Sequence, residues 1–93
     1  MALLTSQVER DSEAFVLRRE RMETLVSELR ERTQQITLGG SEKAVERHRS
    51  RGKMTARERV DRLVDPGTAF LELSALAAWQ LYDGQAPSAG IVT

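Results

Sequence analysis

Hydrophobic side chains recur every seven residues along the first third of the chain. The recurring positions, with two residues that widen the stripe, are Val8, Phe15, Met22, Leu25, Val26, Leu29 and Ile36. This spacing is typical of one face of an α-helix, and residues 6–36 contain no Gly or Pro, so we predict one long helix there. Arg18 and Arg32 place charge where a dedicated coiled coil would be apolar. The stripe therefore indicates a surface helix that packs on its own protein or on a neighbouring subunit.

Glycines and capping residues delimit a shorter helix in the middle of the chain. Gly39 and Gly40 end the long helix, since glycine readily takes the left-handed conformation of a helix C-terminus. Ser41 is then suited to cap a helix that runs to about Arg51, with Gly52 as its stop.

A further helix start follows at Thr55. Glu58 stands three residues later, and this spacing predicts a capping box. The helix should continue to about Val64, because Pro66 disfavours helix at the residue before it and Gly67 permits a positive φ.

The pattern changes after this turn. Residues 70–73 contain a brief apolar and polar alternation, which indicates a short strand. Residues 76–81 are apolar enough to be helical or extended, residues 83–90 are predicted to form a loop, and residues 89–93 begin a second β-type run. The expected fold class is mainly α, with a long N-terminal helix and two short helices that lead into the first β-strands of a core.

Charge is distributed unevenly, although the net charge is zero. Residues 1–38 carry six Lys/Arg and seven Asp/Glu, residues 39–64 carry eight and four, and residues 65–93 carry none and three. We predict three parts: an amphipathic helix at 1–38, a basic helical segment at 39–67, and the start of a further domain at 68–93. The positive excess predicts that the middle part meets an anion or an acidic flank of its own protein.

Composition narrows the class of protein. Ninety-three residues suffice for one small domain, and the absence of cysteine fits a reducing compartment. No apolar run approaches the roughly 20 residues of a membrane span. The first residues lack the basic and apolar regions of a secretory signal, and the early acids Glu9, Asp11 and Glu13 argue against a mitochondrial presequence. We expect a soluble cytoplasmic protein that does not enter a membrane.

Four basic residues form the candidate binding site: Arg47, Arg51, Lys53 and Arg57. The first two lie four residues apart on one predicted helix, and the predicted helix N-terminus near Thr55 adds a partial positive charge and free N–H groups. Such a set could hold a phosphate or a carboxylate. The alternative is a solvated basic face whose arginines pair with acids elsewhere in the fold, and the residue types leave both open.

Other chemistries find little support in the sequence. Zero net charge disfavours nucleic-acid binding, and the aromatic pair Trp79 and Tyr82 lies far from the basic residues along the chain. His48 lacks a second metal ligand other than acids, and we predict that it is packed or hydrogen-bonded. No nucleophile–base pair or Gly-rich phosphate loop stands out, so we assign no catalytic, cofactor-binding or metal-ligating residue.

A long collinear run resembles a known family. It is GGSEKAVERHRSRGKMTARERVDRLVDPGT, residues 39–68, and it is similar to the N-terminal signature of biotin-dependent acyl-CoA carboxylases. Within it, GK-x-TARER and L-x-DPG-[ST] recur in the carboxyltransferase (β) subunits of that family. The continuation FLELSALAAWQLYDG and PSAGIVT most resembles the methylcrotonoyl-CoA and geranyl-CoA branch. The resemblance covers roughly residues 36–93, and residues 1–35 match only as a variable helix.

The resemblance implies a fold, a reaction and partners. The β subunits of the family have two crotonase-like (ββα-spiral) α/β domains, of which residues 68–93 would begin the first. They form hexamers with biotin carboxylase/biotin carrier α subunits. The implied reaction transfers CO₂ from carboxybiotin, carried by that partner, to an acyl-CoA such as 3-methylcrotonoyl-CoA of leucine catabolism. Geranyl-CoA or another acyl-CoA is the alternative substrate.

The resemblance also implies a ligand for the basic residues. Arg47, Arg51, Lys53 and Arg57 become candidate contacts for the phosphates of CoA, and a structural role for these arginines is the alternative. The oxyanion-hole loops of the family lie beyond residue 93. No catalytic residue therefore carries over, biotin is not expected to bind this chain, and the chain alone is expected to be inactive. The alternative function from another class of protein is that of a non-catalytic helical interaction module.

Overall fold

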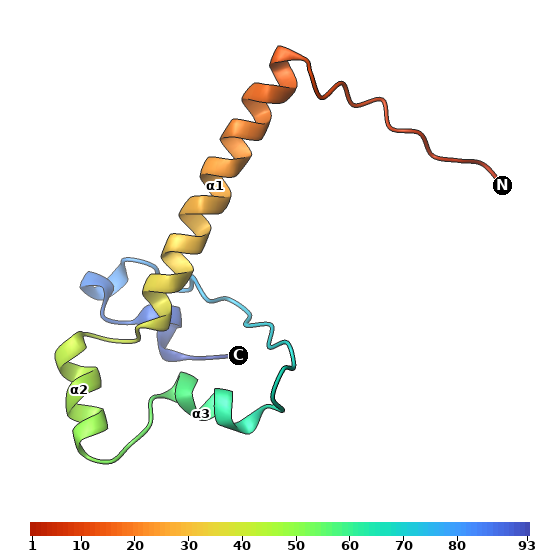
Figure 1. Cartoon of the computed structure of the whole chain (residues 1–93). Helices are drawn as coiled ribbons and strands as arrows, with labels where there is room; N and C mark the ends of the chain where they lie inside the picture. Colours follow the sequence, from red (N-terminus) through yellow and green to blue (C-terminus); the bar gives the residue numbers. More distant parts are fainter. The chain divides into compact units, whose positions relative to one another are not determined.

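The computed structural model describes all 93 residues. The elements along the chain are the α-helices α1 (Glu13–Thr37), α2 (Glu42–Ser50) and α3 (Ala56–Leu63), followed by the 3₁₀ turns η1 (Leu81–Gly84) and η2 (Pro87–Gly90) (Figure 1). Contacts divide the chain into two compact units, Met1–Arg30 and Glu31–Thr93. None of the helices combines the length and apolar character that a membrane-crossing segment requires. The division into three parts at residues 38 and 67 stays a prediction.

Helix α1 begins at Glu13, so the prediction of helix over residues 6–12 is wrong. Ser12 gives the reason. Its Oγ accepts a hydrogen bond from the backbone N–H of Phe15 at 3.2 Å and donates one to the carbonyl of Glu9 at 2.8 Å. A side-chain acceptor in this position satisfies a free N–H group of the first turn and fixes where the helix starts. Val8 therefore lies outside the helix and is exposed.

The apolar stripe of α1 is largely solvent-exposed. Met22, Leu25 and Leu29 expose between 40 and 59% of their surface. Ile36, near the end of the helix, exposes 3% and is the one buried hydrophobic residue of the chain. Helix α1 therefore presents most of its apolar face at the surface.

Both short helices begin where the sequence predicts. Ser41 caps α2 by accepting a hydrogen bond from the N–H of Ala44 at 3.3 Å. At α3, the side chain of Thr55 accepts from the N–H of Glu58, whose carboxylate accepts from the N–H of Thr55 at 2.7 Å. The predicted capping box is confirmed. Gly52 takes a φ of +73°, which confirms its role as a stop after α2.

The two predicted strands are not formed. Residues 70–73 and 89–93 contain no strand, and one backbone hydrogen bond joins these segments, from the N–H of Leu73 to the carbonyl of Thr93 at 2.6 Å. The hydroxyl of Thr93 also donates to the carbonyl of Leu73 at 3.2 Å. A strand needs a ladder of such bonds, and an isolated pair of strands is marginal in water. Residues 83–90 were predicted to form a loop, and the structure places two 3₁₀ turns in this region.

We predict that Ser12→Ala frays the first turn of α1. Loss of an N-cap costs about 1 kcal/mol of local helix stability. The measurement is amide hydrogen exchange and ¹³Cα chemical shift at residues 13–16. Thr24→Ala is the control, because the Thr24 hydroxyl donates to the carbonyl of Glu20 inside the helix and caps nothing. Equal protection of the first turn in Ser12→Ala and the parent would contradict the capping role.

Candidate functional site

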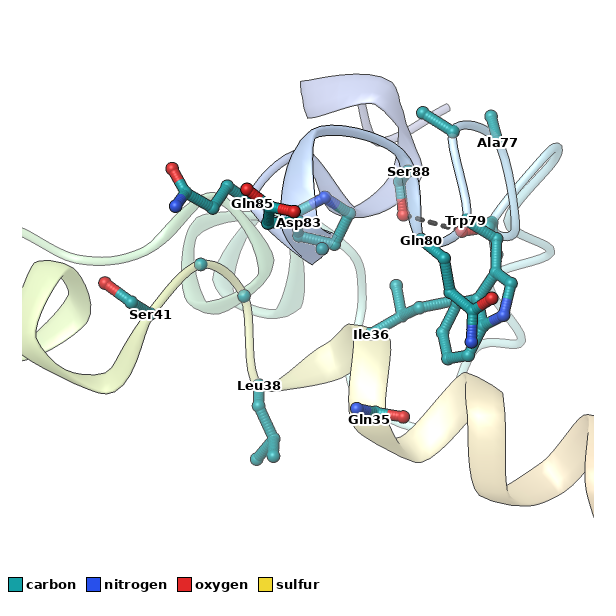
Figure 2. Close-up of a pocket in the computed structure, with 16 residues that line it drawn as sticks. Gln35, Ile36, Leu38, Ser41, Ala77, Trp79, Gln80, Asp83, Gln85 and Ser88 are labelled. Carbon is teal, nitrogen blue, oxygen red and sulfur yellow. Dashed lines mark hydrogen bonds between the residues drawn. The ribbon is translucent and has the colours of Figure 1, made fainter.

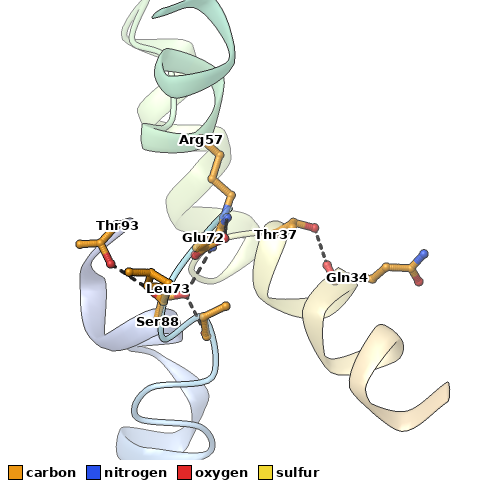
Figure 3. Close-up of polar contacts among 8 residues, drawn as sticks. Gln34, Thr37, Arg57, Glu72, Leu73, Ser88 and Thr93 are labelled. Carbon is orange, nitrogen blue, oxygen red and sulfur yellow. Dashed lines mark hydrogen bonds and ion pairs between the residues drawn. The ribbon is translucent and has the colours of Figure 1, made fainter. Parts of the chain in front are cut away.

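An ion pair joins α3 to the segment that follows it. Arg57, in the first turn of α3, donates from Nη1 and Nη2 to the two carboxylate oxygens of Glu72, at 2.5 and 2.7 Å (Figure 3). The two side chains expose only 21 and 15% of their surface. A paired arrangement of this kind is among the stronger polar contacts in proteins and fixes the plane of the guanidinium group.

Ser88 completes this cluster. It lies in η2, exposes 5% of its surface, and its Oγ accepts a hydrogen bond from Nη2 of Arg57 at 3.3 Å. The same hydroxyl donates to the carbonyl of Ala75 at 2.9 Å. We term Arg57, Glu72 and Ser88 the arginine clamp, since together they connect α3 with two later segments of the second unit (Figure 3).

Both charges of the clamp are stabilised. The hydrogen bond from Arg57 holds the pKa of the Glu72 carboxyl below its usual value, and burial opposes this shift. The hydrogen bond to Glu72 raises the pKa of the Arg57 guanidinium, and burial again works in the opposite direction. The pair is therefore ionised at neutral pH.

The structure places the four predicted anion-binding residues in two different settings. Arg57 is engaged in the clamp. The other three lie in the last turn of α2, at its C-cap and in the loop that follows, and their side chains are exposed: Arg47, Arg51 and Lys53. No hydrogen bond or ion pair links these three side chains to Arg57. Binding of an anion by any of the four stays a prediction.

Other polar groups also have partners. Nε2 of His48 lies 2.8 Å from the carbonyl oxygen of Met54, which confirms the prediction of a hydrogen-bonded histidine. Arg49 pairs with Glu58 at 2.6 Å, at exposed positions. Nowhere in the chain do three or more His, Asp or Glu side chains converge in a way that could hold a metal ion.

Sequence reasoning missed the partners of Arg57. Glu72 is the one charged residue between Asp65 and Asp83, in an otherwise uncharged segment. A lone carboxylate among apolar neighbours seldom stays without a cation, so this isolation was an available signal. No comparable signal marks Ser88, because a serine between proline and alanine is ordinary in a turn.

A cavity of about 490 Å³ lies in the second unit (Figure 2). Its lining includes Ile36, Trp79, Asp83 and Ser88, and the side chain of Ile36 points toward the indole ring. The indole N–H of Trp79 is buried and has no hydrogen-bond partner, and the guanidinium of Arg32 lies 5.3 Å from the ring centroid. No Lys or Arg side chain lines the cavity.

Curated proteins match the sequence, although no family model does. The methylcrotonoyl-CoA carboxylase beta chain, mitochondrial, of Arabidopsis thaliana is 50% identical over 93 residues, which is 100% of this chain and 16% of the relative. The biotin-dependent 3-methylcrotonyl-coenzyme A carboxylase beta1 subunit of Mycobacterium tuberculosis is 55% identical over 69 residues, or 74% of this chain and 13% of the relative. The methylmalonyl-CoA carboxyltransferase 12S subunit of Propionibacterium freudenreichii is 51% identical over 45 residues, or 48% of this chain and 9% of the relative.

These matches extend the resemblance toward the N-terminus. The match to the Arabidopsis chain covers all 93 residues, so it includes residues 1–35, which were expected to match only as a variable helix. The chain spans 16% of the length of that relative.

We predict that the clamp opens when the pH falls through the pKa of Glu72. Because this pKa is depressed in the folded state, the pair contributes its full stability above the ordinary value of 4.5 and loses it at lower pH. Arg57→Ala should raise the pKa of Glu72. The measurement is ¹³C NMR titration of the labelled Glu72 carboxyl in the parent and in the variant. Superimposable titration curves would contradict the ion pair.

Proposed function

We propose that this chain, a relative over its whole length of the β chains of methylcrotonoyl-CoA carboxylase, forms part of a carboxyltransferase subunit. The subunit would transfer CO₂ from carboxybiotin to an acyl-CoA. The observation that carries the proposal is the 50% identity over all 93 residues to the Arabidopsis chain. Because the chain spans 16% of that relative, we assign the reaction to the larger subunit and expect the 93 residues alone to be inactive.

The proposed substrate is 3-methylcrotonoyl-CoA, which would be carboxylated at its γ-carbon to 3-methylglutaconyl-CoA. The extent of the matches supports this choice. Similarity to the methylmalonyl-CoA carboxyltransferase subunit covers 48% of the chain, whereas similarity to the two methylcrotonoyl-type chains covers 74 and 100%. Geranyl-CoA is the competing substrate.

The proposed partners follow from the same reaction. Carboxybiotin would be presented by a biotin-carrying α subunit, and further β subunits would complete a hexamer. Residues 68–93 would begin a crotonase-like domain whose later strands complete the pairing that the hydrogen bond between Leu73 and Thr93 begins. No residue of the 93 is proposed to react with substrate. Their proposed role is to build and position the surroundings of the reaction.

We further propose that the exposed basic residues bind the nucleotide phosphates of CoA. Arg47, Arg51 and Lys53 are exposed around the end of α2, and none of them forms an ion pair. Arg57 has its guanidinium occupied by Glu72 and Ser88, and we leave it out of this group.

We predict that residues 1–93 can replace the matching segment of the Arabidopsis β chain. Assembled with its biotin-carrying partner, this chimera should incorporate radiolabelled bicarbonate into 3-methylcrotonoyl-CoA with less than about a tenfold loss of kcat, equivalent to about 1.4 kcal/mol of barrier. The order of rates over 3-methylcrotonoyl-, geranyl- and propionyl-CoA is measured in the same assay.

The matched control places the same residues in the methylmalonyl-CoA carboxyltransferase 12S subunit of Propionibacterium freudenreichii, where similarity covers 48% of the chain. We expect a loss of roughly a hundredfold there, because misplaced neighbouring segments disturb the reacting geometry. A correctly assembled Arabidopsis chimera without activity would overturn the proposed function. Binding of the isolated chain to intact subunits in that case would favour the interaction module.

We predict that removing the three exposed charges weakens binding of acyl-CoA. In the active chimera, alanine at Arg47, Arg51 and Lys53 together should raise KM roughly tenfold, since each exposed charge contact contributes about 0.5 kcal/mol. KM for the corresponding acyl-pantetheine, which lacks the nucleotide phosphates, should not change. The control removes the same charge from α1 by alanine at positions 18, 21 and 30. An equal rise of KM for both substrates would contradict phosphate binding.

A further inference from the structure

Seven residues other than glycine take a left-handed conformation between positions 74 and 89, and two of them lie in turn η2. Ser88 has a φ of +55° and Ala89 a φ of +52°. Residues other than glycine rarely take these values, because Cβ then crowds the backbone. Such conformations persist where surrounding contacts hold them, and they concentrate at functional positions.

Three hydrogen bonds hold η2 in place. The N–H of Ala89 donates to the carbonyl of Ala77 at 3.0 Å, and the hydroxyl of Ser88 donates to the carbonyl of Ala75 at 2.9 Å. Both partners are in the preceding turn segment. The third bond, from Arg57 to the hydroxyl of Ser88, links η2 to a helix. Arg57 therefore connects η2 to α3.

The direction of the Arg57 side chain is set by Glu72. Contact with both carboxylate oxygens fixes the guanidinium plane, and the same Nη2 that binds Glu72 reaches Ser88. A phosphate ligand would have to compete with a carboxylate already in contact at 2.7 Å. The geometry thus gives Arg57 three hydrogen bonds to partners inside its own chain.

Residues of turn η2 line two cavities. Pro87 and Ser88 line both the cavity of about 490 Å³ and a second one of about 280 Å³, which also includes Arg57 in its lining. A shift of η2 would change both spaces at once. Ser88 of the clamp therefore borders both cavities, and Arg57 borders the second.

We propose that Arg57 is a positioning residue of the carboxyltransferase, which acts through Glu72 and Ser88 to hold η2 in its strained conformation. This inference rests on the proposed function and gives Arg57 a role other than contact with CoA phosphates. It predicts that loss of Arg57 affects the rate of reaction and not the recognition of the nucleotide.

The test compares two substrates in the assembled chimera. Arg57→Ala should lower kcat between roughly tenfold and a hundredfold with 3-methylcrotonoyl-CoA and with its pantetheine ester alike. Ser88→Ala keeps the ion pair and should lower kcat by a smaller factor, again equally for both substrates. The control is Arg49→Ala, which removes the exposed pair with Glu58 and should leave both rates unchanged. A rise in KM confined to the CoA ester would overturn the positioning role and restore Arg57 as a phosphate ligand.

A second measurement does not depend on activity. Hydrogen exchange of the intact subunit should become faster at residues 86–93 in Arg57→Ala and Ser88→Ala, and stay at the parental rate in Arg49→Ala. The charge exchange Arg57→Glu with Glu72→Arg should recover part of the protection. Unchanged exchange at residues 86–93 in Arg57→Ala would overturn the clamp, even with an inactive parent chimera. An inactive parent whose exchange responds as expected would instead count against the proposed reaction.

Discussion

The ion pair between Arg57 and Glu72 is the interaction on which the second unit depends. That unit has one buried hydrophobic residue, Ile36, so apolar packing alone does not determine how its segments meet. The two charges lose solvation when they become partly buried, and their attraction offsets this cost only with good geometry. Bidentate contact and the hydroxyl of Ser88 supply that geometry. The main effect of the ion pair is therefore to specify one arrangement of α3, the segment that contains Glu72, and η2.

Local interactions explain why the helix boundaries could largely be predicted. A capping residue acts over three or four positions, so Ser41 and the pair Thr55 and Glu58 carry their information in adjacent sequence. Ser12 uses the same chemistry, but Phe15 stands where a capping box would have Glu or Gln. The apolar period continues back to Val8 and conceals this start, because periodicity reports which face is apolar and not where the first N–H group finds its acceptor.

Interactions between distant segments explain the rest. A short alternating run becomes a strand only when another strand supplies its hydrogen bonds, and the contact from Leu73 to Thr93 is a single such bond. The positive φ values of Ser88 and Ala89 are invisible in sequence, since neither residue favours them. The same limit applies to the basic residues. Their positive charge can be seen in the sequence, but the difference between Arg57 and the three exposed side chains depends on Glu72, 15 positions further along the chain.

Helix α1 shows how a chain with so little burial can keep a defined local geometry. Its cap at Ser12, its lack of internal glycine and proline, and charge pairs such as Arg19 with Glu23 all act within a few residues. These terms are individually small, and helices in proteins gain most of their stability from packing of an apolar face. The face around Met22 and Leu29 is exposed here, so it retains the apolar area that such packing uses. In the proposed subunit, local caps and the clamp would set the conformation of these residues, and burial of that apolar face would add to their stability.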